Sequence, residues 1–160
     1  MSSDTAKEDI KEKLHGRWII ERMSTTFPDG VEEEHPGASG QLVYNTRLAT
    51  VFAQIARKDS KDPSGKMAFS YYGNILFPEE SKNEVVHCII SASKTDMVGE
   101  NMRRTFNLSA DGQHLRITGA SAKYKEAMIN IDWIKEDDRA RMNDLPTGRR
   151  SRHGEEMNIT

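Results

Sequence analysis

The sequence predicts an all-β fold in which a short helix precedes a small antiparallel barrel. Short segments rich in β-branched and aromatic residues follow one another closely, and turn signals such as Phe27-Pro28-Asp29-Gly30 separate them. No long helical pattern lies between the segments, which argues against a parallel sheet with crossover helices. A Gly-x-Trp motif within Leu14 to Ile20 leads into the first apolar strand. A sandwich is the other architecture that this pattern fits.

A short amphipathic helix is expected over residues 4–14. Thr5 and Glu8 have the spacing of a capping box, and Ile10 and Leu14 form a narrow apolar stripe. The strands that we expect cover residues 17–26, 41–45, 48–55, 67–77, 84–92, 101–108, 114–118 and 129–135. Residues 31–40 hold three consecutive glutamates, a proline and two glycines, so we expect a loop there.

Length and composition predict one barrel domain over residues 1–146 and a flexible tail over residues 147–160. The formal charge of -2 gives no basic field for nucleic acid, and no apolar run is long enough for a transmembrane helix. Residues 1–13 lack the apolar core of a secretory signal. The single cysteine, Cys88, cannot form an internal disulfide, so we expect a protein of the cytoplasm.

Several short motifs occur in the order and spacing of one known family. They include Gly16-Arg17-Trp18, Gly40-Gln41-Leu42-Val43-Tyr44, Tyr71-Tyr72-Gly73, Val85-Val86-His87, Arg104-Thr105-Phe106 and Trp133-Ile134-Lys135. In these motifs the chain resembles the small lipocalin-like domain family, relatives of the lipocalins within the calycin group. The resemblance covers about residues 14–135 and implies an eight-stranded antiparallel up-and-down barrel with an internal pocket. Relatives of this fold include passive carriers and cofactor-free cyclases and isomerases, so the resemblance implies no single function.

The end of the motif series departs from the family. In lipocalins a late basic residue packs over the early tryptophan and closes the base of the barrel. Here Trp18 is present, but Lys135 stands where the family tends to have arginine. An ammonium group cannot stack on a ring as a planar guanidinium does, so the resemblance does not by itself predict this cap.

His87 is one of two candidate catalytic residues. In the strand over residues 84–92, alternation places it on one face with Val85 and Ile89, among apolar side chains. An imidazole titrates near neutral pH and can move a proton in either direction. The alternative is a core histidine whose ring nitrogens are hydrogen-bonded within the protein, and the sequence leaves both roles open.

Arg104 is the other candidate catalytic residue. In the strand over residues 101–108 it alternates with Met102 and Phe106 and is expected inside, whereas Arg103 is expected in solvent. A guanidinium in an apolar interior is costly unless a partner compensates it, and one such partner is an anionic or carbonyl-bearing ligand. The alternatives are a side chain that reaches the barrel mouth and an internal bridge. The internal partners considered are Glu21, Asp132 and Gln54.

Six residues are expected to bind the substrate, namely Tyr44, Tyr71, Phe69, Met102, Phe106 and Arg22. A tyrosine can line an apolar pocket while it presents a hydroxyl group. Tyr71 shares a face with Phe69 and is expected inside, and Gly73 marks a bend or bulge beyond it. Arg22 alternates with the first apolar residues of its strand and is also expected to turn inward.

No motif for a nucleotide, a metal ion or a nucleophilic triad occurs, so we expect no cofactor and no metal. We predict a cofactor-independent isomerase or cyclase, with a lyase as a variant, that acts on a small apolar metabolite of the natural-product type. Arg104 would stabilise developing negative charge and His87 would transfer the proton. The alternatives are a non-catalytic carrier of a small hydrophobic molecule and an interaction module with a filled barrel. The sequence leaves open whether the chain forms a homodimer.

Overall fold

The computed structural model describes residues 3–58, 66–121 and 124–136, so the tail expected over residues 147–160 lies outside the described residues. No helix in the described ranges is long and apolar enough to cross a membrane. The helix α1 (Ser3–Leu14) begins before Thr5, so the predicted capping box does not mark its start. The strands are β1 (Gly16–Thr26), β2 (Glu32–Glu34), β3 (Ser39–Asn45), β4 (Thr50–Lys58), β5 (Lys66–Leu76), β6 (Glu84–Ala92), β7 (Asn101–Leu108), β8 (His114–Ala120) and β9 (Met128–Lys135). A short turn of 3-10 helix, η1 (Thr95–Met97), joins β6 to β7.

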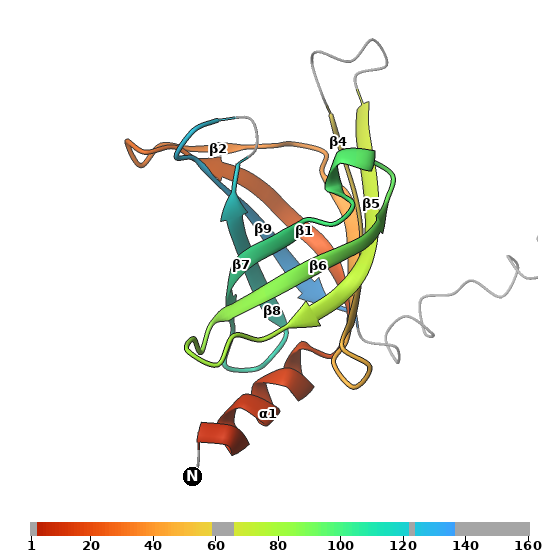
Figure 1. Cartoon of the computed structure of the whole chain (residues 1–160). Helices are drawn as coiled ribbons and strands as arrows, with labels where there is room; N and C mark the ends of the chain where they lie inside the picture. The colour runs from red at the N-terminus through yellow and green to blue at the C-terminus, as the bar shows by residue number, and fades with distance from the viewer. Residues whose placement is uncertain (1–2, 59–65, 122–123, 137–160) are drawn as a thin grey trace, which may run out of the picture.

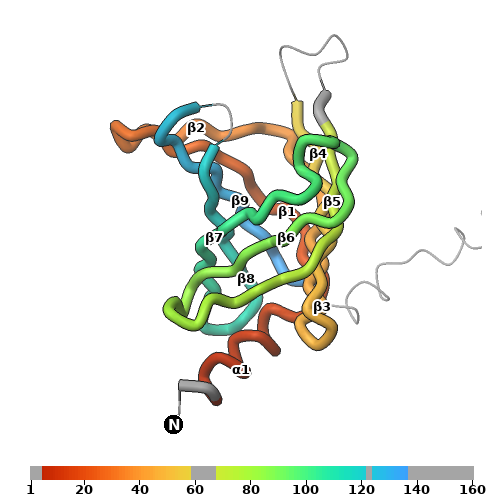
Figure 2. The backbone as a smooth tube through the Cα atoms, viewed as in Figure 1, coloured from red at the N-terminus to blue at the C-terminus, as the bar shows by residue number. Residues whose placement is uncertain are grey.

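Eight of these strands form a closed barrel, which confirms the predicted fold (Figure 1). β1 pairs with β3, each later strand pairs with the next, and β9 returns to pair with β1. Every registered pair is antiparallel, and the backbone can be followed around the barrel in Figure 2. Within the described residues, closure leaves no long sheet edge unpaired, which is how a barrel avoids edge-to-edge association.

Alternating side chains fill the interior of the barrel. In β4, Val51, Ala53 and Ile55 are buried, whereas Phe52 on the opposite face is 36% exposed. Successive residues of a strand point to opposite faces, so the inward set of each strand builds a shared core. The same alternation makes Tyr71 buried and Tyr72 exposed, which confirms the predicted orientation of this pair.

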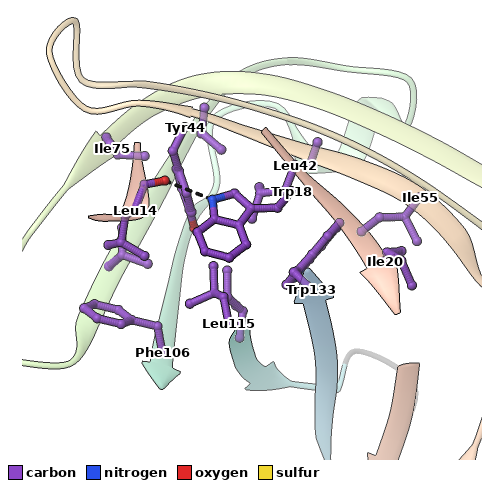
Figure 3. Packing of buried hydrophobic residues seen from close by; sticks show 14 of the residues in the cluster. Leu14, Trp18, Ile20, Leu42, Tyr44, Ile55, Ile75, Phe106, Leu115 and Trp133 are labelled. Carbon is purple, nitrogen blue, oxygen red and sulfur yellow. Dashed lines mark hydrogen bonds between the residues drawn. The ribbon is translucent and has the colours of Figure 1, made fainter. Parts of the chain in front are cut away.

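The end of the barrel next to α1 is closed by packed side chains. The indole Nε1 of Trp18 donates a 2.9 Å hydrogen bond to the carbonyl of Leu14, the last residue of α1 (Figure 3). Nζ of Lys135 lies 5.2 Å from the centroid of the Trp18 ring and donates to the carbonyl of Lys13 at 2.7 Å. Lysine therefore provides the cap that the sequence left unpredicted, through a cation–π contact rather than by stacking.

Strand β2 lies at the end of the barrel opposite α1, where the sequence predicted only a loop (Figure 1). Its three glutamates pair with the last residues of β1, in the register Ser24 to Glu34 through Thr26 to Glu32. Glutamate has a low strand propensity, but Arg22 forms ion pairs with Glu32 at 3.2 Å and Glu34 at 3.3 Å. These cross-strand contacts favour strand pairing where local propensity does not.

Candidate functional site

Tyr44, His87 and Tyr71 form a hydrogen-bonded row across the interior of the barrel. They come from β3, β6 and β5. Tyr71 lies on the strand next to that of His87, whereas Tyr44 lies three strands away, so the curvature of the barrel brings Tyr44 to the imidazole. The hydroxyl oxygen of Tyr44 lies 2.7 Å from Nε2 of His87, and that of Tyr71 lies 2.8 Å from Nδ1. The three residues are 1%, 2% and 6% exposed in the order Tyr44, His87, Tyr71. Both ring nitrogens of His87 therefore have a partner inside the protein.

The row is uncharged at neutral pH. Burial, reinforced by the nearby cation of Arg104, lowers the pKa of His87 to about 3. Burial raises the pKa of Tyr71 to about 12 and that of Tyr44 well above its ordinary value. A neutral imidazole has one N–H and one lone pair, so one tyrosine donates to His87 and the other accepts from it. The accepting tyrosine keeps a hydroxyl proton that it can donate to another group.

Arg103 and Arg104 are adjacent in β7 and differ in their surroundings. Arg103 lies outside the barrel and pairs with Glu80, at 2.9 Å, and with Glu84. Arg104 is half-buried on the inner face, and its Nη1 donates to the carbonyl of Arg103 at 3.2 Å. No carboxylate among the described residues lies within ion-pair distance of Arg104. Burial lowers the pKa of Arg104 from its ordinary value, and the side chain nevertheless stays charged.

Apolar side chains on the inner face remain partly exposed toward the open end of the barrel. Phe69, Met102, Ile129 and Ile131 all pack against the core and are only half-buried. Nζ of Lys94, in the connection between β6 and β7, lies 5.0 Å from the centroid of the Phe69 ring. The closed half is thus filled by fully buried residues, whereas the open half presents accessible apolar surface beside Arg104.

Two clefts formed by described residues lie away from this group. One of about 480 Å³ lies between α1 and the turn that joins β5 to β6, and its lining includes Lys7, Lys11, Phe77, Lys82 and Phe106. The other, of about 230 Å³, is lined by residues of β1, β7, β8, β9 and the β7–β8 turn. Neither cleft is lined by the tyrosines, His87 or Arg104. The candidate interior site therefore consists of inward side chains that remain accessible.

The prediction that Arg22 turns inward is wrong. A β-bulge between Ile20 and Arg22 shifts the alternation of β1, so that Met23 faces the core and Arg22 faces outward. There Arg22 pairs with Glu32 and Glu34 and lies 3.8 Å from Asp132.

The other predicted site residues divide between the two ends of the barrel. Tyr71, Phe69 and Met102 share the interior with His87 and Arg104. Tyr44 reaches the same row from the closed end, where it lies beside Trp18, and Phe106 packs near Leu14 at that end (Figure 3). None of the internal partners considered for Arg104 pairs with it. Asp132 binds Arg116 at 2.6 Å, Gln54 accepts from Gln41 at 3.2 Å, and the exposed Glu21 lies 3.8 Å from His114.

Gly119 is the site residue that the sequence analysis missed. It lies in β8, one step beyond the last registered pair of β7 and β8, Thr105 with Thr118. A Cβ atom at position 119 would lie 2.5 Å from Cδ and Nη1 of Arg104. A glycine inside a strand is itself a signal of close approach, and it was available in the sequence.

Among the described residues, no group of three or more His, Cys, Asp or Glu side chains is placed to hold a metal ion. No protein-family model matches the chain, and no curated protein matches it in sequence. The resemblance to the lipocalin-like family stays a prediction, although the barrel that it implied is the fold observed.

Proposed function

We propose that the chain binds a small, largely apolar metabolite in the open half of its barrel and isomerises or cyclises it without a cofactor. The observation that carries this proposal is the uncharged row of Tyr44, His87 and Tyr71 beside the inward cation of Arg104. Functional sites often contain titratable groups whose pKa values are shifted by burial. Here such groups gather on the inner face of the barrel.

The proposed chemistry starts from a carbonyl oxygen of the substrate. Tyr71 is the more exposed tyrosine of the row and its hydroxyl donates to that oxygen, while Arg104 stabilises the negative charge that develops on it. His87 donates its Nδ1 proton to Tyr71 in this arrangement, and Tyr44 donates to Nε2. The apolar side chains around Met102 hold a flexible substrate in a reactive conformation, which supplies proximity.

The row suits a reaction in which the proton returns to the same substrate. The Tyr44 hydroxyl has His87 as its one hydrogen-bond partner within the described residues, and it is fully buried. A proton drawn along the row would leave a tyrosinate at Tyr44, which its raised pKa strongly disfavours. An isomerisation or a cyclisation conserves the atoms of the substrate, so a proton that leaves one of its atoms can be restored to another.

A non-catalytic carrier is the second candidate, and one observation favours it. Both nitrogens of His87 are satisfied within the protein, and its pKa of about 3 makes it a weak base at neutral pH. A carrier needs the accessible apolar surface and the Arg104 cation, but no movement of protons.

Incubation with a panel of small apolar carbonyl compounds in deuterated buffer, without added cofactor, tests the proposal. An isomerase or cyclase yields a product of unchanged composition with altered chromatographic retention, or deuterium exchanged into the recovered compound. Tyr71→Phe should lower that rate by roughly 10²–10⁴-fold, the range typical of general acid–base groups. Compounds that bind but are recovered unaltered would support the carrier, and the absence of binding would overturn both candidates.

A further inference from the structure

We infer that the interior site takes a ligand with a single anionic headgroup, and that Gly119 seats the guanidinium of Arg104 which binds it. This inference rests on the proposed function, since it concerns the same interior site. The ligand has an apolar body that carries one carboxylate, enolate or comparable anion. Gly119, which bears no side chain, has a positioning role.

Two neighbouring cations of β7 are neutralised unevenly. Arg103 is exposed, where a cation needs no partner, and yet it has two glutamates. Arg104 is half-buried, where a cation needs compensation, and no carboxylate of the described residues is near enough to pair with it. An anion from outside the protein would supply the missing charge.

The backbone holds the guanidinium of Arg104 close to β8. Nη1 donates to the carbonyl of Arg103, which leaves Nε and Nη2 without a hydrogen-bond partner in the described structure. The group lies against Gly119, where a methyl group would come within 2.5 Å of Cδ and Nη1 and 2.6 Å of Cζ. The absence of a side chain at position 119 thus lets the guanidinium lie close to β8, with its remaining donors free for an oxyanion.

The rest of the ligand would meet mainly apolar side chains. The half-buried apolar side chains on the inner face toward the open end are Phe69, Met102, Ile129 and Ile131. Alternation in β4 places a further half-buried cation, Arg57, on the same face as Ile55, near the end of that strand. The tyrosines and His87 below them are neutral at physiological pH. Among the described residues, Arg104 is the cation beside the neutral row, and apolar side chains lie above it, which matches a ligand with an apolar body and one anionic group held next to the row.

A matched pair of fluorescent probes tests the inference. Anilinonaphthalene sulfonate and phenylnaphthylamine share an aromatic body, and only the first carries an anion. The affinities of both probes are measured by fluorescence titration for the full chain and for Arg104→Met, Arg103→Met and Gly119→Ala. Arg103→Met removes the same charge from the outer face, so it controls for non-specific attraction. Thermal unfolding of each variant shows that it remains folded.

The expected result is selective for the anion. Arg104→Met should weaken sulfonate binding by about 10- to 100-fold, as expected for loss of a charge-assisted hydrogen-bonded pair, and leave phenylnaphthylamine unchanged. Gly119→Ala should weaken sulfonate binding in the same direction because it displaces the guanidinium, and Arg103→Met should affect neither probe.

Two contrary results separate the inference from the proposed function. If both probes bind equally well, or if Arg103→Met and Arg104→Met weaken the sulfonate equally, the anion site is refuted while the apolar barrel site stands. If neither probe binds the folded wild-type chain, the interior binding site and the inference fall together. If Gly119→Ala binds the sulfonate as well as the wild type does, while Arg104→Met binds it more weakly, the positioning role of Gly119 is refuted.

Discussion

The Tyr71 hydroxyl lies 2.8 Å from Nδ1 of His87, in a part of the barrel where both side chains are almost fully buried. Tyr44 occupies the other ring nitrogen, so this imidazole is held in one orientation by the neighbouring strand β5 and by β3, which lies three strands away. Hydrogen bonds of this kind fix side chains that a purely apolar core would leave free to rotate. The contact has consequences for stability as well as for function.

Removal of the Tyr71 hydroxyl should destabilise the fold. Tyr71→Phe leaves Nδ1 of His87 buried without its partner, and an unsatisfied buried group costs about 1–3 kcal/mol. We expect the free energy of unfolding in urea to fall by about that amount. Tyr72→Phe is the matched control, since Tyr72 is 45% exposed, and it should change stability by less than about 0.5 kcal/mol. Equal effects of the two substitutions would show that the hydrogen bond to His87 is not formed in solution.

Burial of His87 should make the protein sensitive to mild acid. The pKa of His87 is about 3 in the folded chain, against 6.5 for an unperturbed histidine. At pH values between these two pKa values, His87 is protonated in the unfolded chain and neutral in the folded chain. The free energy of unfolding therefore falls as the pH falls. From about pH 7 to about pH 5 this single group should cost about 2 kcal/mol.

His87→Gln isolates that contribution, because glutamine can hydrogen-bond the tyrosines and does not titrate. Urea unfolding is measured for both proteins at the two pH values, and the wild type should lose about 2 kcal/mol more than the variant. A variant that loses just as much on acidification would show that His87 titrates normally in the folded state.

The contact of α1 with the barrel should contribute a large part of the stability. Leu14 is 1% exposed beneath Trp18, and a buried Leu→Ala substitution usually costs about 2–5 kcal/mol. We expect a loss in that range for Leu14→Ala, measured by chemical denaturation. Leu48→Ala, at a position that is 72% exposed, should be close to neutral. A neutral Leu14→Ala would contradict the view that α1 closes the barrel.

A polar cluster around Asn130 on the outer face of the barrel should also stabilise the fold. Asn130 is 5% exposed, donates to Ser24 at 3.3 Å and Thr26 at 2.8 Å, and accepts from Thr118 at 3.0 Å. Asn130→Ala removes these bonds and should lower the unfolding free energy by about 1–3 kcal/mol. Asn107→Ala, on an exposed position of β7, serves as the control and should have little effect. Similar losses in both variants would mean that the cluster adds no specific stability.

The strands could be predicted because each of them carries its own pattern. The segment of β6 is rich in valine and isoleucine, and the alternation in β7 places Arg104 inside and Arg103 outside without any knowledge of the neighbours. Inward positions follow from the period of two along a strand, so His87 and Tyr71 could be placed in the interior from the sequence.

The features that the sequence did not predict depend on neighbouring strands. A bulge in β1 reverses the alternation at Arg22, and no local signal in the sequence marks it. The strand formed by Glu32 to Glu34 exists because Arg22 and Ser24 compensate its charges. The contact of His87 with Tyr44 joins strands three places apart in the sheet, so it depends on the curvature of the barrel, which pattern analysis of single strands cannot supply.

Chemical-shift mapping tests the central claim most directly, because it shows where a guest binds. Proton–nitrogen correlation spectra of the labelled chain are recorded while anilinonaphthalene sulfonate is added. We predict that the amide signals of Ile89, Met102 and Gly119 shift together, since these residues surround the interior site next to Arg104. Shifts confined to Lys7, Glu79 and Lys82 would place the guest in the outer cleft beside α1 and contradict a binding site inside the barrel.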